Sequence, residues 1–275
     1  MTFLEKVKYN FETQSTLTQI IIINAAVYLT VNLIGNLSHL NLLLYTALPI
    51  GGTLFILKFW TLFTYMFTHA DFWHLFWNMV LFYFMSQLFL NIMGQKKLLY
   101  LYVMSGLSGG AIVLILGLLF PASFGGSILI GASAAVLGIG ATMAIFSPNY
   151  RVYLFGVLEM PFKYVYLGIF ILNTLIDLSI NTGGKISHIG GALFGLLYGY
   201  QLKNGYDLFN FSFQPKKKSN LKVVYNSESI VQKNKSENKS EDERLNVLLD
   251  KISKSGYDSL SKNEKDELFK LSQKK

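Results

Sequence analysis

The sequence places side chains that can carry out acyl transfer inside strongly apolar stretches. They are His74 and Asn78 within FTHADFWHLFWN, Ser133 within GASAAVLG and His188 within SHIGGALFGLLYGY. A serine hydroxyl becomes a useful nucleophile when a base within hydrogen-bond reach takes its proton. Ser133 and His188 supply such a pair if the fold brings them together, and donors aimed at the oxyanion would complete the chemistry.

The four-residue spacing of His74 and Asn78 puts both side chains on one face of a helix, about one turn apart. Both can therefore donate a hydrogen bond to the same point in front of that face. Each of the four residues also has a purely structural alternative. A buried asparagine or histidine often links membrane helices, and a serine often caps a helix or packs as a small residue.

Composition identifies the class of protein in which these residues must work. Of 275 residues, 52% are hydrophobic and only 15% are charged, and the mean hydropathy is +0.38. This is too apolar for an ordinary soluble domain, so we expect an all-α integral membrane protein. The sequence has no cysteine, which excludes disulfides and thiol chemistry and leaves oxygen, nitrogen or carboxylate nucleophiles.

Six apolar runs are candidates for membrane-spanning helices of roughly 20 residues, the fourth being shorter. They cover residues 16–36, 72–93, 97–120, 131–147, 161–180 and 186–203. The first follows a polar segment, 1–15, and lacks a clear small-residue cleavage site, so we interpret it as a retained anchor. Pro49, Gly51 and Gly52 interrupt the apolar segment 37–71, which we predict to be an outer loop lying partly in the membrane interface.

The basic residues orient these spans. With the N-terminus in the cytoplasm, 22 of the 24 Lys and Arg residues fall on the inner side, and only Lys58 and Lys185 lie outside. Much of this excess comes from the C-terminal tail, but the short loops indicate the same orientation. Six spans then place both termini in the cytoplasm.

The tail after Lys203 has a different composition. Residues 204–240 include Pro215 and three consecutive lysines at 216–218, which predicts a flexible linker with a basic patch suited to anionic lipid. Residues 241–275 are predicted to form a small two-helix unit, a packing or adaptor element whose partner is unknown. Its signals are two S-x-x-E capping boxes, an apolar stripe and a terminating glycine: Ser240 with Glu243, Ser261 with Glu264, then Leu245, Leu248, Leu249 and Ile252, and Gly256.

Two stripes of small residues predict how the helices that carry Ser133 and His188 meet. The stripes, each repeating every four residues, are Gly191, Gly195 and Gly199, and Ala134, Gly138 and Thr142. Small residues at this spacing let two helices approach backbone to backbone. Facing stripes would therefore bring Ser133 and His188 together near the outer ends of their helices.

The start of the Ser133 helix is suited to stabilising negative charge. Glycines at 125, 126 and 131 let the preceding loop bend, and the first amides of a helix lack intrahelical partners. The Ser133 amide, with the side chains of Asn78 and His74, is therefore a candidate oxyanion hole. No Asp or Glu is placed to orient His188, so we predict a catalytic dyad of Ser133 and His188 with no metal and no cofactor.

Three motifs together resemble the rhomboid intramembrane serine proteases. They are His74-x-x-x-Asn78 in the second span, Gly131-Ala132-Ser133-Ala134 at the start of the fourth, and His188-x-x-Gly191-x-x-x-Gly195 in the sixth; His69 also matches a histidine that the family often has. The resemblance covers roughly residues 15–203, with the motifs in matching order and in matching spans.

The resemblance implies a six-helix rhomboid bundle at 16–203 in a bacterial plasma membrane, with Ser133 and His188 in a cavity open to the outer face. The implied activity is cleavage of other proteins' membrane helices, favouring small residues and loosely wound segments. The first loop, the fifth span and the segment SINTGGKIS at 179–187 would form the substrate gate.

The sequence departs from the family pattern at four positions. Ala134 replaces a glycine, and Leu137 replaces an aromatic residue one turn after the serine. Thr61 follows a tryptophan where an arginine is common, and Leu90 lies where an acidic residue is expected late in the second span. These changes affect loop anchoring and the orientation of the catalytic histidine, but they leave both reacting groups in place.

Other classes of function are less well supported. A catalytically silent rhomboid-like binding protein would normally have lost the serine or the histidine. A transporter would need an intramembrane carboxylate or paired broken helices, and only Asp177 comes close. A metalloprotease needs a motif such as H-E-x-x-H, which is absent. Nucleic-acid binding is disfavoured because acids interleave the lysines of the tail and aromatic residues are few.

Overall fold

The computed structural model describes residues 2–51, 54–124, 126–154, 156–176, 181–210 and 244–272. The chain divides into two compact units, Met1–Lys217 and Lys218–Lys275, and each is described by itself. Several features expected from the sequence lie outside the described residues: Gly125, Asp177, Ser179 and Ile180, the linker beyond residue 210, and the Ser240–Glu243 capping box.

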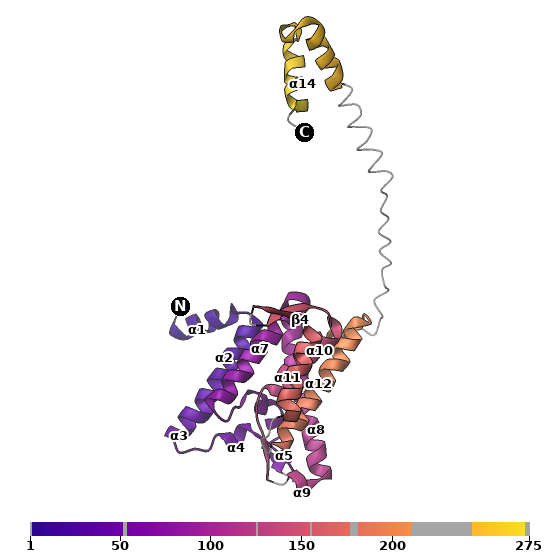
Figure 1. Ribbon diagram of the computed structural model, residues 1–275. Helices are drawn as coiled ribbons and strands as arrows, with labels where there is room; N and C mark the ends of the chain where they lie inside the picture. The colour runs from indigo at the N-terminus through magenta and orange to yellow at the C-terminus, as the bar shows by residue number, and fades with distance from the viewer. Residues whose placement is uncertain are drawn as a thin grey trace. The chain divides into compact units, whose positions relative to one another are not determined.

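The first unit is a bundle of apolar helices that run side by side (Figure 1). A short helix, α1 (Phe3–Glu12), precedes the bundle. The long helices are α2 (Thr16–Tyr28) continued by the π-helical η1 (Leu29–Ile34) and α3 (Gly35–Leu37), α7 (Phe72–Met93), α8 (Gln95–Leu119), α10 (Ser133–Phe146), α11 (Phe162–Ile171) continued by the π-helical η3 (Leu172–Ile176), and α12 (Thr182–Lys203).

Three of these helices are long and apolar enough to cross a membrane: Thr16–Leu37, Phe72–Met93 and Gln95–Leu119. Ser133–Phe146 and Phe162–Ile176 are apolar but shorter, and α12 has 22 residues with more small and polar side chains. The mostly helical architecture is the one expected of an all-α membrane protein. The helix predicted at 131–147 is shorter in the structure because Gly131, with a φ of 114°, cannot continue it.

The sixth helix begins earlier than predicted. The predicted sixth span covers 186–203, and the segment 179–187 was expected to form part of the gate, whereas α12 begins at Thr182. The reason is an N-cap: the Asn181 side chain accepts a hydrogen bond from the Gly184 amide at 2.9 Å. In addition, Gly183 packs so closely on Ile50 that a Cβ would come 2.7 Å from its Cδ1. Residues 182–187 therefore form the first turns of α12.

The first loop, between α3 and α7, contains only short elements. They are α4 (Leu43–Thr46), β1 (Leu48–Pro49), α5 (Leu54–Leu57), α6 (Thr61–Thr64) and the 3-10 turn η2 (Tyr65–Phe67). Large apolar side chains on this loop are exposed, among them Leu57 and Phe59, as suits a segment in the membrane interface. After α8, a short helix α9 (Pro121–Phe124) leads to β2 (Ile128–Leu129), which pairs antiparallel with β1. This pairing fastens the first loop to the segment that leads into Ser133.

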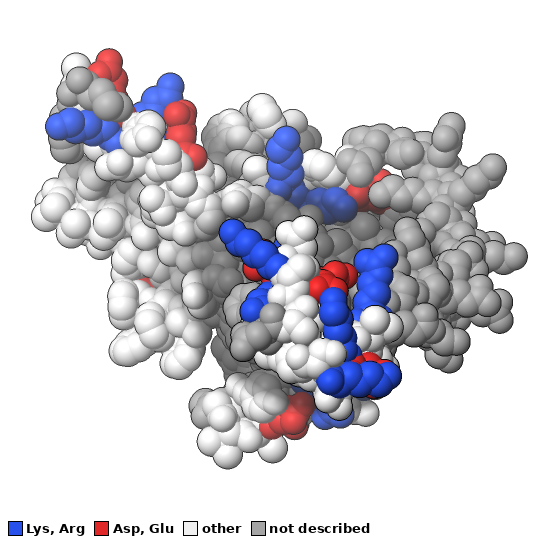
Figure 2. Space-filling model, turned by 90° about the horizontal axis from the view of Figure 1, so that it is seen from above, with Lys and Arg blue, Asp and Glu red and all other residues white. Residues whose placement is uncertain are grey.

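The opposite end of the bundle carries a hairpin and an ion pair. The strands β3 (Arg151–Leu154) and β4 (Leu158–Pro161) join α10 to α11. Beyond α12, the Asp207 carboxylate lies 2.8 Å from Lys97 Nζ and accepts a hydrogen bond from the Tyr198 hydroxyl at 3.2 Å. These contacts hold the segment before the 3-10 turn η4 (Leu208–Asn210) on α8 and α12. In Figure 2, which shows the molecule from above, Lys and Arg side chains lie next to Asp and Glu side chains within each of the two units.

The two stripes of small residues face each other in the contact between α10 and α12. A Cβ at Gly191 would overlap the Ala134 carbonyl, and a Cβ at Gly195 would overlap the Gly138 carbonyl. Thr142 Oγ1 donates to the Gly195 carbonyl at 3.0 Å. The helices therefore run parallel with their backbones in contact, an arrangement that only small residues permit.

Ala134, which stands where the family pattern has glycine, is accommodated by a glycine on a third helix. The Ala134 side chain is buried, and a Cβ at Gly109 of α8 would come 2.7 Å from the Ala134 Cβ. Gly190 of α12 is equally tight, since a Cβ there would come 2.9 Å from Gly109 Cα. The extra methyl group of Ala134 thus fills space that Gly109 leaves open.

The described part of the second unit is a helical hairpin. A helix over residues 244–255 is followed by the 3-10 turn η5 (Tyr257–Ser259) and by α14 (Lys262–Ser272). Gly256, with a φ of 78°, follows the first helix, as predicted. Leu248 of the apolar stripe is buried, whereas Leu249 of the same stripe is 48% exposed. A contact between only two helices is narrow and leaves the neighbour of Leu248 outside.

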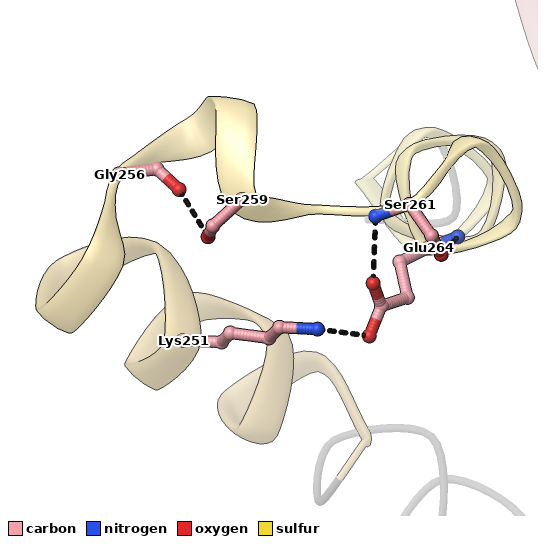
Figure 3. Close-up of polar contacts among 5 residues, drawn as sticks. All are labelled: Lys251, Gly256, Ser259, Ser261 and Glu264. Carbon is pink, nitrogen blue, oxygen red and sulfur yellow. Dashed lines mark hydrogen bonds and ion pairs between the residues drawn. The ribbon is translucent and has the colours of Figure 1, made fainter.

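Glu264 connects the two helices of this hairpin (Figure 3). One carboxylate oxygen accepts from the Ser261 amide at 2.8 Å, and the Ser261 hydroxyl accepts from the Glu264 amide at 3.4 Å. These two bonds form the capping box that the sequence predicted. The other carboxylate oxygen lies 2.7 Å from Lys251 Nζ on the first helix.

Gly109→Ala is expected to destabilise the bundle by about 1–3 kcal/mol, as overpacked cores do. The new methyl group would lie 2.7 Å from both the Ala134 Cβ and the Ser187 carbonyl oxygen. Adding Ala134→Gly should recover part of the loss, because it removes one of these two clashes. Thermal unfolding of the purified protein in detergent measures the effect. Gly168→Ala is the control, since a Cβ there meets nothing within 4 Å; strictly additive effects would contradict the contact.

The hairpin should lose stability in acid through Glu264. Its bonds to the Lys251 ammonium and to Ser261 lower the pKa of Glu264 from 4.5 to about 2. The stabilisation is therefore fully present above pH 4.5 and is lost as the pH falls through about 2. Amide hydrogen exchange over 244–272 in the full-length protein, corrected for intrinsic rates, should show greater protection than in Glu264→Gln at pH 7 and no difference near pH 2.

A matched control for this prediction is Glu267→Gln. The Glu267 carboxylate is 3.7 Å from Arg244, a longer contact between exposed side chains, so its loss should matter little. Equal loss of protection in the two variants at pH 7 would contradict the role of Glu264.

Candidate active site

Ser133 is the first residue of α10, and Gly131 determines how the chain enters that helix. The φ of Gly131 is 114°, which favours glycine, and its amide donates to the Tyr65 carbonyl at 2.9 Å. A Cβ at Gly131 would come 2.8 Å from His74 Nε2. Gly131 therefore lets the backbone before Ser133 turn sharply and lie directly against the His74 ring.

The Ser133 and His188 side chains meet. His188 lies in the second turn of α12, and its Nε2 is 2.7 Å from Ser133 Oγ. With Nε2 unprotonated, the serine hydroxyl donates to it, which is the arrangement that proton transfer from a nucleophilic hydroxyl requires. The parallel contact of α10 and α12 fixes this distance, because each residue stands at the same end of its stripe of small residues.

Ser133 and His188 line a cavity of about 600 Å³. Its other lining residues come from the starts of α7 and α12, from α10 and from η3; they include Asp71, Trp73, His74, Trp77, Asn78, Leu137, Leu172, Asn173 and Asn181. In the described part of the chain, no three His, Cys, Asp or Glu side chains are grouped so as to hold a metal ion. The reacting pair therefore lies in a space with both polar and apolar walls.

His74 and Asn78 lie on the same face of α7 and both line this cavity. The Asn78 side chain is 8% exposed, and its amide nitrogen donates to the His74 carbonyl at 2.8 Å. A primary amide has two N–H donors, so one remains to serve a group inside the cavity. The Asp71 carboxylate accepts from the His74 backbone amide at 2.9 Å and caps the helix that carries both residues.

His69 lies behind His74 and is absent from the lining residues described above. Its side chain is completely buried, its ring centroid is 5.0 Å from that of His74, and its Nδ1 is 3.3 Å from the Phe67 carbonyl. Asn32 donates to the His69 carbonyl at 3.0 Å. These contacts hold the His69 ring edge-on against the His74 ring.

The remaining departures from the family pattern have identifiable surroundings. Leu137 is buried on α10 and contributes an apolar wall to the cavity. Thr61 is buried, and its hydroxyl donates to the Lys58 carbonyl at 2.6 Å. The Lys58 ammonium in turn lies 2.8 Å from the Leu44 carbonyl, so a lysine three residues earlier ties the first loop together. Leu90 is partly buried and packs against the core of the bundle.

Sequence reasoning missed two capping residues, Asp71 and Asn181, which lie at the N-termini of α7 and α12. Each lines the cavity, and its side chain accepts a hydrogen bond from a backbone amide in the first turn of its helix. These are the helices that carry His74, Asn78 and His188. The signal was present, since Asp and Asn are preferred N-caps. Asn173 was also missed; it lines the cavity from η3, and its amide donates to the Ile169 carbonyl at 2.8 Å.

Comparison with known families matches this arrangement to one of them. The family model described as the Rhomboid domain matches residues 57–204, which is more than half of the chain. No curated protein sequence matches the chain significantly. The matched segment runs from the first loop through α12 and includes Ser133, His188 and the His74–Asn78 face. The chain belongs to the rhomboid family.

Proposed function

We propose that the protein is an intramembrane serine endopeptidase that hydrolyses peptide bonds in or near the membrane helices of substrate proteins. The observation that carries this proposal is the 2.7 Å contact between Ser133 Oγ and His188 Nε2 inside a cavity of the bundle. Membership of the rhomboid family supports it, because rhomboids are typically intramembrane serine proteases. Retention of both reacting groups argues against the alternative, a catalytically silent rhomboid-like binding protein.

In the proposed first half-reaction, Ser133 Oγ bonds to the scissile carbonyl carbon while its proton moves to His188 Nε2. The carbonyl π electrons move onto the oxygen and produce a tetrahedral oxyanion. Collapse of this intermediate breaks the carbon–nitrogen bond, and the proton on His188 goes to the leaving amine. The products of this half are an ester on Ser133 and a new amino terminus.

Water completes the proposed cycle. A water molecule in the cavity gives a proton to His188 as its oxygen bonds to the ester carbon. The second intermediate collapses by breaking the bond to Ser133 Oγ, which recovers its proton from His188. The released product carries a new carboxyl group, and atoms and charges balance without any further reactant.

The oxyanion would lie at the start of α10, in front of the His74–Asn78 face. The donors proposed for it are the Ser133 amide, which is at a helix start, the second N–H of the Asn78 amide, and His74 Nε2. Donors held in place before the reaction cost no reorganisation when the charge develops. Gly131, Ala134, Gly191 and Gly195 are proposed to support this geometry through the close backbone contacts, and His69 by supporting the His74 ring.

A substrate helix must unwind before it can react. The carbonyl groups of a helix are hydrogen-bonded and shielded by side chains, so we propose that small residues and loosely wound segments are preferred. The first loop, the fifth span (α11 with η3) and the segment 179–187 are proposed as the gate. Asp71 at the end of the first loop, Asn173 of η3 and Asn181 line the cavity from these regions.

The proposed topology has six spans formed by the six apolar helical segments over 16–203, in a bacterial plasma membrane with both termini in the cytoplasm. The helix starts that carry Ser133 and His188 lie at one end of the bundle, on the proposed outer side. The turn at Lys96 and Lys97 and the hairpin at Arg151 are on the other. We propose a cytoplasmic segment at 1–15, a basic linker at 204–240 and a two-helix unit at 241–275 with an unknown partner.

Ser133→Ala and His188→Ala are each expected to reduce cleavage of a reporter membrane helix in proteoliposomes by a factor on the order of 10⁴ or more. A serine-reactive fluorophosphonate should label the wild type, label His188→Ala weakly and leave Ser133→Ala unlabelled. Ser108→Ala is the control, because the Ser108 hydroxyl donates to the Gly190 carbonyl at 3.0 Å and has no proposed role. Cleavage at the wild-type rate by a well-folded Ser133→Ala preparation would defeat the proposal.

Asn78→Ala is expected to lower kcat by about 10²-fold with little change in KM, because its help is realised mainly in the transition state. Asn173→Ala is a closely matched control: Asn173 also lines the cavity and also donates to the carbonyl four residues earlier, at 2.8 Å. Steady-state kinetics on the reporter helix separate the two constants. A change in KM alone for Asn78→Ala, or equal losses of kcat in the two variants, would argue against the oxyanion role.

A further inference from the structure

A second cavity of about 690 Å³ forms a groove between α11 and α12, at the end of the bundle opposite the candidate active site. Four residues of the α11 wall form a stripe at i, i+3, i+4 and i+7: Lys163, Tyr166, Leu167 and Phe170. The fifth, Tyr164, lies at the rim with its ring centroid 5.0 Å from Lys163 Nζ. The α12 wall is also one stripe: Ala192, Leu196, Tyr200 and Lys203. Each helix therefore presents one continuous face to the groove.

The two stripes end in lysines at the same end of the groove. α11 starts at Phe162 and α12 ends at Lys203, and both helix ends contribute to the one cavity. From Lys163 to Phe170 is about 10 Å along the axis, and from Lys203 to Ala192 about 16 Å, at 1.5 Å per residue. The groove is thus about as long as one leaflet of the hydrocarbon core, which is roughly 15 Å.

The floor of the groove is the end of α10. Ala144, Ile145 and Pro148 line it from below, and α10 packs against both α11 and α12. At the far end α12 contacts η3, which closes the groove in that direction. Side chains on its rim are exposed and apolar, among them Leu167, and in a membrane bundle such a face meets acyl chains.

The polar groups of the groove form a set at one end. None of the described lining residues is acidic, so the two ammonium groups face no carboxylate within the groove. The Tyr166 side chain is 7% exposed, and its hydroxyl is itself buried, because the ring packs against Gly140 of α10. Tyr166 lies one turn deeper than Lys163, about 4.5 Å along α11. Its ring therefore adds to the apolar wall, and the two lysines supply the charge of the groove.

We propose that this groove binds an anionic phospholipid. The phosphate lies between Lys163 and Lys203, and an acyl chain lies along the two apolar stripes. Free phosphate would use only the lysines and leave the apolar walls uncovered, whereas a lipid with no net charge would use only the walls. The inference goes beyond the proposed proteolysis and does not depend on it.

The test uses purified full-length protein in detergent, titrated with phosphatidylglycerol and with phosphatidylcholine of the same acyl chains, with bound lipid counted by native mass spectrometry. Phosphatidylglycerol should bind more tightly. The double variant Lys163→Gln/Lys203→Gln should weaken its binding by about 25-fold, because each lysine near a lipid surface contributes about fivefold.

The matched control is Lys6→Gln/Lys8→Gln, which removes the same charge from α1. It should leave the affinity for phosphatidylglycerol within about twofold of wild type. Inorganic phosphate at the same concentration should displace none of the lipid. Equal losses in the two double variants, displacement by phosphate, or equal binding of the two lipids would each overturn the proposal.

Discussion

The geometry of the candidate site depends on the backbone contact between α10 and α12. With no side chains at Gly191 and Gly195, the carbonyl oxygens of α10 lie where Cβ atoms would otherwise be. Contact between two backbones is a hard limit, so neither helix can move closer, and the Thr142 hydroxyl bond keeps them from sliding apart. The 2.7 Å separation of Ser133 Oγ and His188 Nε2 is the result of that limit. A shift of about 1 Å in such a pair can cost 10²-fold in rate.

The third helix, α8, extends this constraint. Its Gly109 approaches α10 and α12 so closely that the family's usual glycine at 134 could become alanine without opening the contact. The Ala134 methyl group occupies space that a side chain at position 109 would otherwise need. Close packing explains why alanine at position 134 leaves Ser133 and His188 in place. The side chains of all three helices must together fill the contact, and no single residue determines the distance between the helices.

Much of this architecture follows from local sequence signals, and the rest does not. The apolar run at 72–93 gives the bounds of α7 directly, and the four-residue repeat of small residues indicates which faces of α10 and α12 meet. The stripes also placed Ser133 near His188, because periodicity on a helix converts spacing into direction. These are properties of single helices or of one helix pair, and the chain carries them within a few residues.

Features that depend on distant residues were not foreseen. The pairing of β1 with β2, the early start of α12 and the accommodation of Ala134 by Gly109 each require knowing which segments lie side by side. Leu249 also shows what a local pattern cannot predict. A helical stripe identifies an apolar face, but the number of its residues that become buried depends on the width of the surface that packs against it. The groove between α11 and α12 could not be predicted from the sequence either. Its two stripes form one cavity only because both helices pack against the end of α10.

α11 is the element that joins the two cavities. Its last part, η3, supplies Leu172 and Asn173 to the candidate active site, while Lys163 and Tyr166 near its start line the proposed lipid groove. The wider π-helical turn of η3 interrupts the regular bonding of the helix between these regions. A ligand that binds only one arrangement of α11 stabilises that arrangement in proportion to its occupancy. Lipid bound between α11 and α12 would therefore oppose movement of the proposed gate helix. The rate of the proposed proteolysis would then depend on the lipid composition of the membrane, because bound lipid fixes the position of α11.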